Sequence, residues 1–277
     1  MLDLATLLGL GLALGAILGS VIIEGGHLGA LVNIPAAVIV FGGTFGATII
    51  CNRLDDILKL PVVLRHAFIS ARHDPLETTQ KMVELATVAR RDGFLALEDS
   101  LKDIQEPFMA KGIQMMADGT APETVTEVLQ TELYQLEQRH TAGANILLTM
   151  GGLAPTLGVT GTVMGLVHMM GKLDDPGSMG PAIASAFLAT LYGVASANVI
   201  FIPLGNKLKA LSKREQLVCE IVIEGVGAIQ KGASPIIVAE SLKAFVTPKL
   251  RAQLEESRGA GQSTSGEESI EPQAKAS

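Results

Sequence analysis

Residues 140–171 read HTAGANILLTMGGLAPTLGVTGTVMGLVHMMG, a run of 32 residues without Asp, Glu, Lys or Arg. Three other runs of this kind occupy residues 4–23, 25–52 and 176–206, and they hold 20, 28 and 31 residues. A helix rises about 1.5 Å per residue, so roughly 20 apolar residues cross the ~30 Å hydrocarbon core of a bilayer. We therefore predict four membrane-spanning helices, near residues 4–23, 30–51, 145–170 and 180–203.

The composition of the whole chain agrees with this prediction. Of the 277 residues, 18% are charged, against about 25% in an average soluble domain, and the mean hydropathy is +0.40. The alternative, four buried helices of a large soluble protein, does not need uncharged runs of this length. The net charge of −7 and the lack of a basic domain disfavour nucleic acid as a partner. The two cysteines, Cys51 and Cys219, have neither CxxC nor metal-ligand spacing.

The distribution of Lys and Arg predicts the orientation. Residues 53–139 hold 10 of the 21 basic residues, residues 207–275 hold another 10, and Lys172 is the remaining one. The positive-inside rule places both segments, and therefore both termini, in the cytoplasm. Asp3 precedes the first apolar run and no Lys or Arg does, so the basic start of a signal peptide is absent and we expect this span to be retained.

The segments between and after the spans carry helical patterns with clear breaks. Pairs that interrupt a helix stand at Asp74-Pro75, Glu106-Pro107, Asp118-Gly119 and Ala121-Pro122. The stretch 76–101 has apolar residues at helical spacing, with Gly93 as a candidate break. From Glu123 the pattern continues without a breaker into the third span, and the fourth span continues past Pro203 to Ile229. We therefore predict two long helices that extend out of the membrane.

The predicted fold is an all-α membrane protein. It has four transmembrane helices, a cytoplasmic helical domain between helices 2 and 3, and helical extensions of helices 3 and 4. The predicted parts are transmembrane helices 1 and 2 (1–51), the cytoplasmic helical domain (52–143), transmembrane helices 3 and 4 (144–205), cytoplasmic C-terminal helices (206–250) and a disordered tail rich in Ser, Glu, Gln and Gly (251–277).

The sequence lacks the patterns of an enzyme. The five histidines are scattered without metal-ligand spacing, and we expect no catalytic residue, metal or cofactor. Gly158, Gly161 and Gly165 lie inside an apolar helix, which favours helix packing over nucleotide binding. We expect these small residues, with Ala182, Ser185, Ala186 and Ala189 of the fourth span, to pack subunits of a ring together. The spans contain no carboxylate, so if ions cross here, a partner helix must supply the acid.

Three segments are diagnostic of a family: ARRDGFLALED at 89–99, GGLAPTLGVTGTVMGL at 151–166 and GPAIASAFLATLYG at 180–193. They resemble the flagellar motor stator A subunits, the MotA/PomA family within the MotA/TolQ/ExbB proton channel superfamily, over about residues 1–250. The resemblance implies a bacterial inner-membrane protein that works with a MotB/PomB-type B subunit, whose single membrane helix carries an aspartate. It also implies a homo-oligomeric ring of five A subunits around two B helices. Sodium or proton flow then rotates the ring and turns the rotor switch protein.

The resemblance also implies roles for particular residues. Pro155 and Pro203 match prolines used for torque generation and conformational change, since a proline removes a backbone hydrogen bond and permits a bend. A static kink is the alternative. Arg90 and Glu98 match the charged pair that meets the rotor, with Arg91 as an auxiliary. A solvated helix face is the alternative for these three.

The ion pathway is assigned to Thr162 and Thr190. Thr162 lies 13 residues before Asp175 and Thr190 lies 15 after it, so at ~1.5 Å per residue the two hydroxyls lie at nearly the same depth. Hard cations prefer oxygen ligands, and these positions match threonines of sodium-type stators, so we favour sodium over proton. The alternative is that each hydroxyl bonds to a carbonyl of its own helix. An ExbB/TolQ-type energising subunit and a membrane scaffold without an ion role are the competing functions.

Overall fold

The computed structural model describes residues 3–69, 74–171, 174, 176–248 and 251. These residues are nearly all helical and contain no β-strand, which confirms the predicted all-α fold. Apart from Arg251, the predicted disordered tail lies outside the described residues. The chain divides into two compact units: a membrane unit, residues 1–72 and 136–213, and a head unit, residues 73–135 and 214–277.

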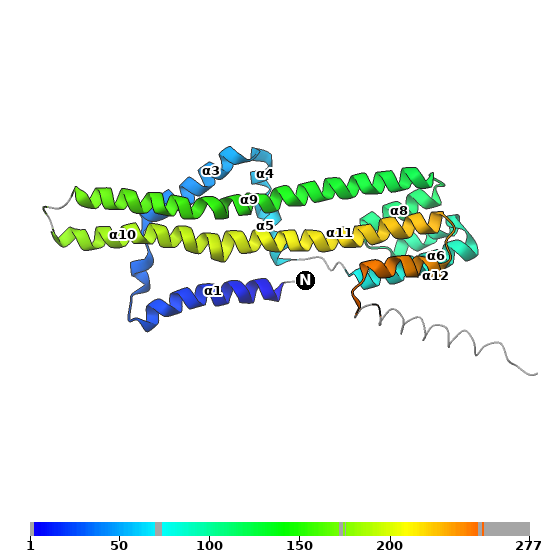
Figure 1. Cartoon of the computed structure of the whole chain (residues 1–277), viewed down its shortest axis with the longest axis horizontal. Helices are drawn as coiled ribbons and strands as arrows, with labels where there is room; N and C mark the ends of the chain where they lie inside the picture. Colours follow the sequence, from blue (N-terminus) through cyan, green and yellow to red (C-terminus); the bar gives the residue numbers. More distant parts are fainter. Residues whose placement is uncertain (1–2, 70–73, 172–173, 175, 249–250, 252–277) are drawn as a thin grey trace, which may run out of the picture. The chain divides into compact units, whose positions relative to one another are not determined.

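Within the described residues, four helical segments are long and apolar enough to cross a membrane, which confirms the prediction of four spans. They are Leu4–Ile23, Leu28–Cys51, Pro122–Met170 and Met179–Gln230, and the spans proper are their uncharged runs within 4–23, 25–52, 140–171 and 176–206. The first is helix α1 (Leu4–Ile23). The third is a single 49-residue helix, α9 (Pro122–Met170), as the unbroken apolar pattern predicts. Figure 1 shows α9 beside α10 (Pro176–Ala195).

The second and fourth spans are less regular. The second consists of a 3₁₀ turn, two short α-helices and a π-helical turn between those two: η1 (Leu28–Leu31), α2 (Ile34–Ala37), η2 (Val38–Gly42) and α3 (Gly43–Cys51). In the fourth, the π-helical segment η5 (Ser196–Phe201) joins α10 to α11 (Ile202–Gln230). The wide turn of η5 lies just before Pro203, whose ring cannot fit against the carbonyl four residues earlier in a regular α-helix.

Two short helices follow the second span, α4 (Leu54–Leu58) and α5 (Leu60–Phe68). Leu60 and Ala67 of α5 are buried in one cluster with residues of α9, η5 and α11. The buried members of this cluster are Leu60, Ala67, Ala144, Ile146, Leu147, Met150, Ala154, Ala197, Phe201, Leu204 and Leu208. This apolar cluster holds the cytoplasmic ends of the spans together.

Helix α1 buries none of its residues within the chain. It is held mainly at its start, where Asp3 caps the helix by accepting a hydrogen bond from the Thr6 amide at 3.2 Å. The Asp3 amide donates to the Phe68 carbonyl at 2.9 Å, and the Asp3 carboxylate forms an ion pair with Lys207 of α11. The Lys207 ammonium is the main cause of a pKa of Asp3 below its usual value.

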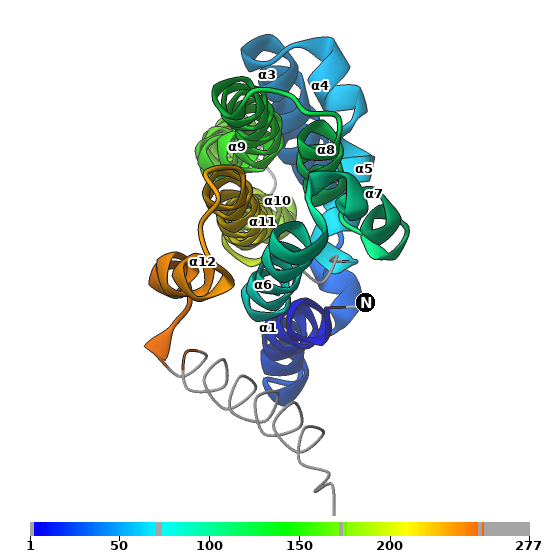
Figure 2. The ribbon, with the colours of Figure 1, turned by 90° about the vertical axis from the view of Figure 1, so that its right-hand side faces the viewer.

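The head unit is a small helical domain of its own. It contains α6 (Pro75–Asp92), η3 (Phe94–Ala96), α7 (Leu97–Ser100), η4 (Leu101–Asp103), α8 (Pro107–Ala117), α12 (Pro235–Leu242) and η6 (Lys243–Phe245), with parts of α9 and α11. Figure 2 shows α6 near α12, which packs against it. The core contains Met82, Leu85, Ile113, Leu129 and Ile221, each at most 1% exposed.

The boundaries inside the head unit follow the predicted breaks. Helices α6, α8 and α9 each begin at the proline of a predicted break, where the missing amide would have had no helical partner. Gly93 ends α6, because its φ of +85° is a conformation that other residues rarely adopt. The helical pattern of residues 76–101 is therefore interrupted after Asp92.

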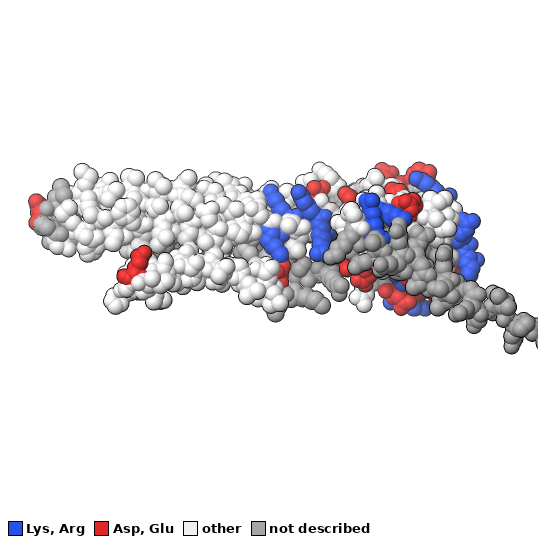
Figure 3. Space-filling model, turned by 60° about the horizontal axis from the view of Figure 1, so that its bottom comes forward, with Lys and Arg blue, Asp and Glu red and all other residues white. Residues whose placement is uncertain are grey.

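Charged side chains are unevenly distributed in the membrane unit. On the face shown in Figure 3, the spans carry neither acidic nor basic residues except near their outer turns. Within the same unit, Lys and Arg gather at the opposite ends of the spans. This distribution fits a helical bundle that crosses a bilayer.

Candidate functional site

The contact between α9 and α10 is close because glycines line it. A Cβ on Gly158 would lie 2.8 Å from the Ala189 carbonyl oxygen, and one on Gly161 would lie 2.7 Å from the Ala189 Cβ. A Cβ on Gly165 would lie 2.7 Å from the Ala186 Cβ. No larger side chain fits at these positions without moving α10. Small residues that let two backbones approach are the usual basis of helix packing in membranes.

The sequence led us to expect that Gly158, Gly161 and Gly165, with Ala182, Ser185, Ala186 and Ala189 of the fourth span, pack subunits of a ring together. Within one chain, the three glycines pack against Ala186 and Ala189 of α10. The contacts between subunits stay a prediction.

The two threonines assigned to the ion pathway lie within this contact. The hydroxyls of Thr162 and Thr190 are hydrogen-bonded to each other across the two helices. The Thr162 Oγ1 also lies 3.1 Å from the Gly158 carbonyl of its own helix and 3.1 Å from the Ala186 carbonyl of α10. The two hydroxyls are thus close enough to bond to each other, and the alternative back-bond to the own helix is present for Thr162.

The carbonyls determine what the hydroxyl pair can offer a ligand. A threonine hydroxyl has one proton and two lone pairs. If Thr162 donates its proton to either nearby carbonyl, one lone pair accepts from Thr190 and the other remains for a cation. The spans supply no carboxylate, and the described residues contain no cluster of three or more His, Cys, Asp or Glu side chains that could hold a metal.

The two prolines assigned to conformational coupling lie in α9 and in α11. Pro155 lies inside α9 and leaves the Gly151 carbonyl without its helical partner. Pro203 is the second residue of α11, directly after the π-helical segment η5. A Cβ on Gly151 would lie 2.5 Å from the Ile202 Cγ1, so the backbone one helical turn before Pro155 packs on the residue that precedes Pro203.

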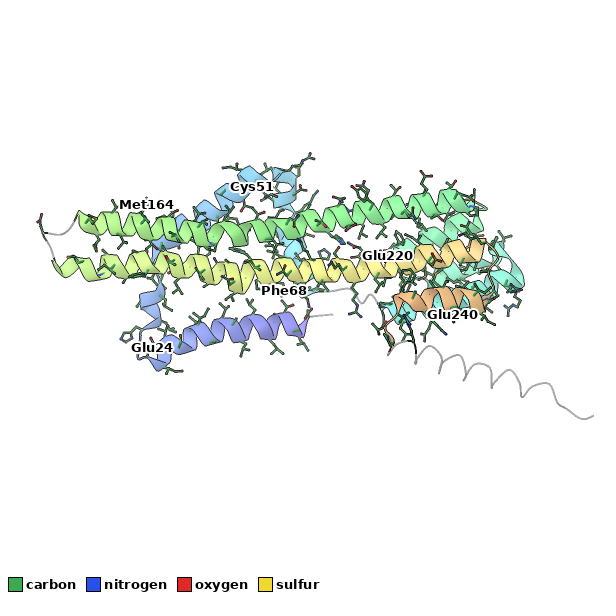
Figure 4. The ribbon with its side chains drawn as sticks, in the orientation of Figure 1. Glu24, Cys51, Phe68, Met164, Glu220 and Glu240 are labelled. Carbon is green, nitrogen blue, oxygen red and sulfur yellow. The ribbon has the colours of Figure 1, made fainter. Side chains whose placement is uncertain are left out.

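The outward faces of α9 and α10 are apolar and exposed. They carry Val159, Val163, Met164 and Val167 on α9, and Phe187, Leu191 and Val194 on α10. Figure 4 shows Met164 on the side of α9 turned away from α10. These faces are available to lipid or to other membrane helices.

The charged residues assigned to the rotor lie in the head unit around Gly93. Arg90 and Arg91 lie in the last turn of α6, and Glu98 lies in α7; all three are exposed. Arg91 Nη2 forms an ion pair with Asp92 Oδ2 at 2.7 Å, which lowers the pKa of Asp92. Within the described part of the chain, neither Arg90 nor Glu98 has an ion pair.

Comparison with known proteins agrees with this architecture. Residues 7–93 match the motility protein A N-terminal family, and residues 100–221 match the MotA/TolQ/ExbB proton channel family. Motility protein A of Borreliella burgdorferi is 36% identical over 258 residues, which cover 93% of this chain and 99% of the relative. The chain belongs to the motility protein A family. PomA of Vibrio alginolyticus, a member named as a chemotaxis protein, is 34% identical over 91% of this chain and 98% of its own length.

Solved structures place this family member in the same fold. The flagellar MotAB stator complex from Bacillus subtilis contains a chain that is 35% identical, with a TM-score of 0.82 over 89% of this chain and 98% of that one. The MotAB structure from C. jejuni matches at 29% identity and a TM-score of 0.83, over 89% and 96% of the two chains. A four-span motility protein A fold is therefore shared along nearly the whole described chain.

Sequence reasoning missed two contacts that organise this family member. One is the ion pair of Asp3 with Lys207, and the other joins Tyr192 to the backbone of Leu31 and Asn33. The sequence did contain a hint of the role of Tyr192, because this tyrosine is the one titratable side chain in residues 176–206. The ion pair joins residues about 200 positions apart, and no local pattern connects them.

Proposed function

We propose that this chain is the A subunit of a bacterial flagellar stator, and that it couples ion flow to rotation of the rotor. Its relatives are named motility protein A and PomA, and its structural neighbours are MotAB stators. The observation that carries the proposal is the threonine pair of α9 and α10 in a bundle without carboxylates. Such a bundle offers oxygen ligands but needs an acid from a partner.

The proposed partner is a MotB-type B subunit with one membrane helix and an aspartate. Five copies of this chain form a ring around two B helices in the bacterial inner membrane, with both termini in the cytoplasm. The ion is cargo, and the site needs no resident cofactor. Each ion that passes neutralises the charge of the aspartate beside Thr162 and Thr190 while it is bound, and this change lets the ring advance.

Pro155 and Pro203 transmit this movement. Each proline removes one backbone hydrogen bond from its helix, so α9 and α11 bend there at lower cost than elsewhere. The contact of Gly151 with Ile202 makes the two bends move together. The resulting tilt of α9 and α11 is the movement that is transmitted to the rotor.

Arg90, Arg91 and Glu98 form the proposed contact with the rotor switch protein. Exposed ion pairs contribute at most ~1 kcal/mol each. Weak contacts of this size can form and break at every step of the motor. Among the residues that the structure describes, neither Arg90 nor Glu98 forms an ion pair, which supports their availability to the rotor.

The threonine pair favours sodium as the ion, with proton as the alternative. The test is swimming in sodium buffer against potassium-only buffer, in a host without its own stator that expresses this chain and its B subunit. Thr162→Ala is the test variant. Thr126→Ala is the matched control, because Thr126 makes a similar back-bond to the Pro122 carbonyl, at 2.9 Å, but lies in the head unit.

Sodium-dependent swimming that is lost in Thr162→Ala and kept in Thr126→Ala supports the sodium assignment. Full speed without sodium, unchanged by Thr162→Ala, contradicts it and leaves proton transfer to the partner aspartate. No swimming with any ion, despite membrane insertion of both subunits, contradicts the stator function itself. An ExbB/TolQ-type role is disfavoured by the match of residues 7–93 to the motility protein A N-terminal family.

A further inference from the structure

The second span is interrupted inside its apolar stretch. Val32 and Asn33 are extended, with φ, ψ of −97°, 111° and −135°, 107°, between η1 and α2. The Asn33 side chain caps α2 by accepting a hydrogen bond from the Ala36 amide at 2.9 Å. The break also takes the Leu31 carbonyl and the Asn33 amide out of regular helical pairing. Unpaired backbone groups are costly in lipid, so a break of this kind needs partners from elsewhere in the protein.

One side chain supplies both partners. The Tyr192 hydroxyl of α10 donates to the Leu31 carbonyl and accepts from the Asn33 amide at 2.8 Å. Its ring stacks on Phe41 of η2, with ring centroids 6.2 Å apart and an interplanar angle of 25°. Tyr192 therefore joins α10 to both sides of the break, and replaces the hydrogen bonds that a continuous helix would make.

The same region of α10 lies next to the threonine pair. Tyr192 is two residues after Thr190, and Ala189 shares a buried cluster with Ala36 and Val40 of the second span. On α9, Gly161 directly precedes Thr162, and a Cβ on Gly161 would lie 3.5 Å from the Ile39 Cγ2 of the second span. The second span thus contacts both α9 and α10 beside the two hydroxyls.

We propose that Tyr192 is a positioning residue for the ion pathway. Its hydroxyl fixes the broken second span against α10, and this span in turn holds α9 and α10 at the separation at which Thr162 and Thr190 meet. The part of this inference that concerns ions rests on the proposed function. The part that concerns the break in the second span stands on the hydrogen bonds alone.

The test compares the two tyrosines of the chain. Tyr192→Phe keeps the ring that stacks on Phe41 and removes only the hydroxyl. Tyr134→Phe is the matched control, because Tyr134 is 57% exposed on α9 in the head unit. Motor speed is measured against sodium concentration at fixed pH and against pH at fixed sodium, at equal amounts of membrane-inserted complex.

We expect Tyr192→Phe to raise the ion concentration for half-maximal speed by about threefold or more, as the loss of a modest hydrogen bond would. Tyr134→Phe should leave it unchanged. A lower maximal speed with an unaltered ion dependence would mean that Tyr192 is only structural, and would overturn the positioning role. An unchanged curve in Tyr192→Phe would overturn it as well.

A second measurement does not depend on motility. Hydrogen exchange of the purified complex with its B subunit can be followed at the Asn33 amide, which donates to the Tyr192 hydroxyl. We expect about fivefold faster exchange at this amide in Tyr192→Phe, with no change in the head unit. Unchanged exchange at Asn33 would overturn the link between Tyr192 and the second span. If the unaltered chain drives no motor, the proposed stator function fails. If exchange at Asn33 nevertheless rises in Tyr192→Phe, the structural link between Tyr192 and the second span holds.

Discussion

Replacing Gly158 by alanine tests the link between helix packing and the ion pathway. The new Cβ would lie 2.8 Å from the Ala189 carbonyl oxygen, 3.2 Å from the Thr190 Cα and 3.3 Å from the Gly193 Cα, all backbone atoms of α10. A carbon and a carbonyl oxygen normally stay about 3.3 Å apart, so α10 must retreat by roughly 0.5 Å. Overpacking of this kind costs about 1–3 kcal/mol. The retreat occurs at Thr190 itself and pulls it away from Thr162.

The assay is the thermal unfolding midpoint of the purified complex, followed by swimming speed in a host without its own stator. We expect the midpoint of Gly158→Ala to fall by about 3 °C or more and motility to be strongly reduced. Gly46→Ala is the control, because no atom lies within 4 Å of a Cβ at that position of α3. It should be neutral or slightly stabilising, since alanine favours a helix over glycine. An unchanged midpoint and normal swimming in Gly158→Ala would refute the reasoning.

Three further predictions concern charged residues and cysteines. Arg90→Glu or Glu98→Lys should impair swimming without changing the mass of the purified complex, and an opposite reversal on the rotor should restore part of it; a loss of assembly would indicate a structural role instead. Asp3→Asn keeps the cap of α1 but loses the ion pair, so it should lower the unfolding midpoint at neutral pH. Because the pKa of Asp3 is lowered in the fold, this difference should shrink as pH falls below 3.8 and disappear once the carboxylate is protonated in the folded protein as well. A difference that does not shrink at low pH would contradict the ion pair. Burial raises the pKa of Cys219 to about 12, so at pH 8 a maleimide should label the exposed Cys51 and leave Cys219 until the protein is denatured.

The sequence predicted most of the helical framework because membrane spans need long uncharged runs. The first span was placed at residues 4–23 and is found there, since a continuous apolar helix has no other arrangement in lipid. The breaks at Pro75, Pro107 and Pro122 were equally local, because proline cannot donate a hydrogen bond.

The details of the site depend on contacts between distant segments, and these were not readable. The equal depth of Thr162 and Thr190 followed from counting residues along two helices, but the shared carbonyl of Ala186 did not. The break in the second span at Asn33 has the residue type of a helix cap, yet only the fold shows that Tyr192 completes it. A capping residue predicts where a helix starts, and says nothing of which distant side chain pairs with the exposed backbone.

The central claim is that this chain is a torque-generating unit, and the most direct test is the speed of single motors. Beads are attached to the flagella of a host without its own stator, and this chain is induced together with its B subunit. We predict that speed rises in discrete, equal steps as units join the motor, and falls to zero when the driving ion is removed. A correctly inserted complex of the two subunits that produces no steps in speed with either sodium or a proton gradient would contradict the account.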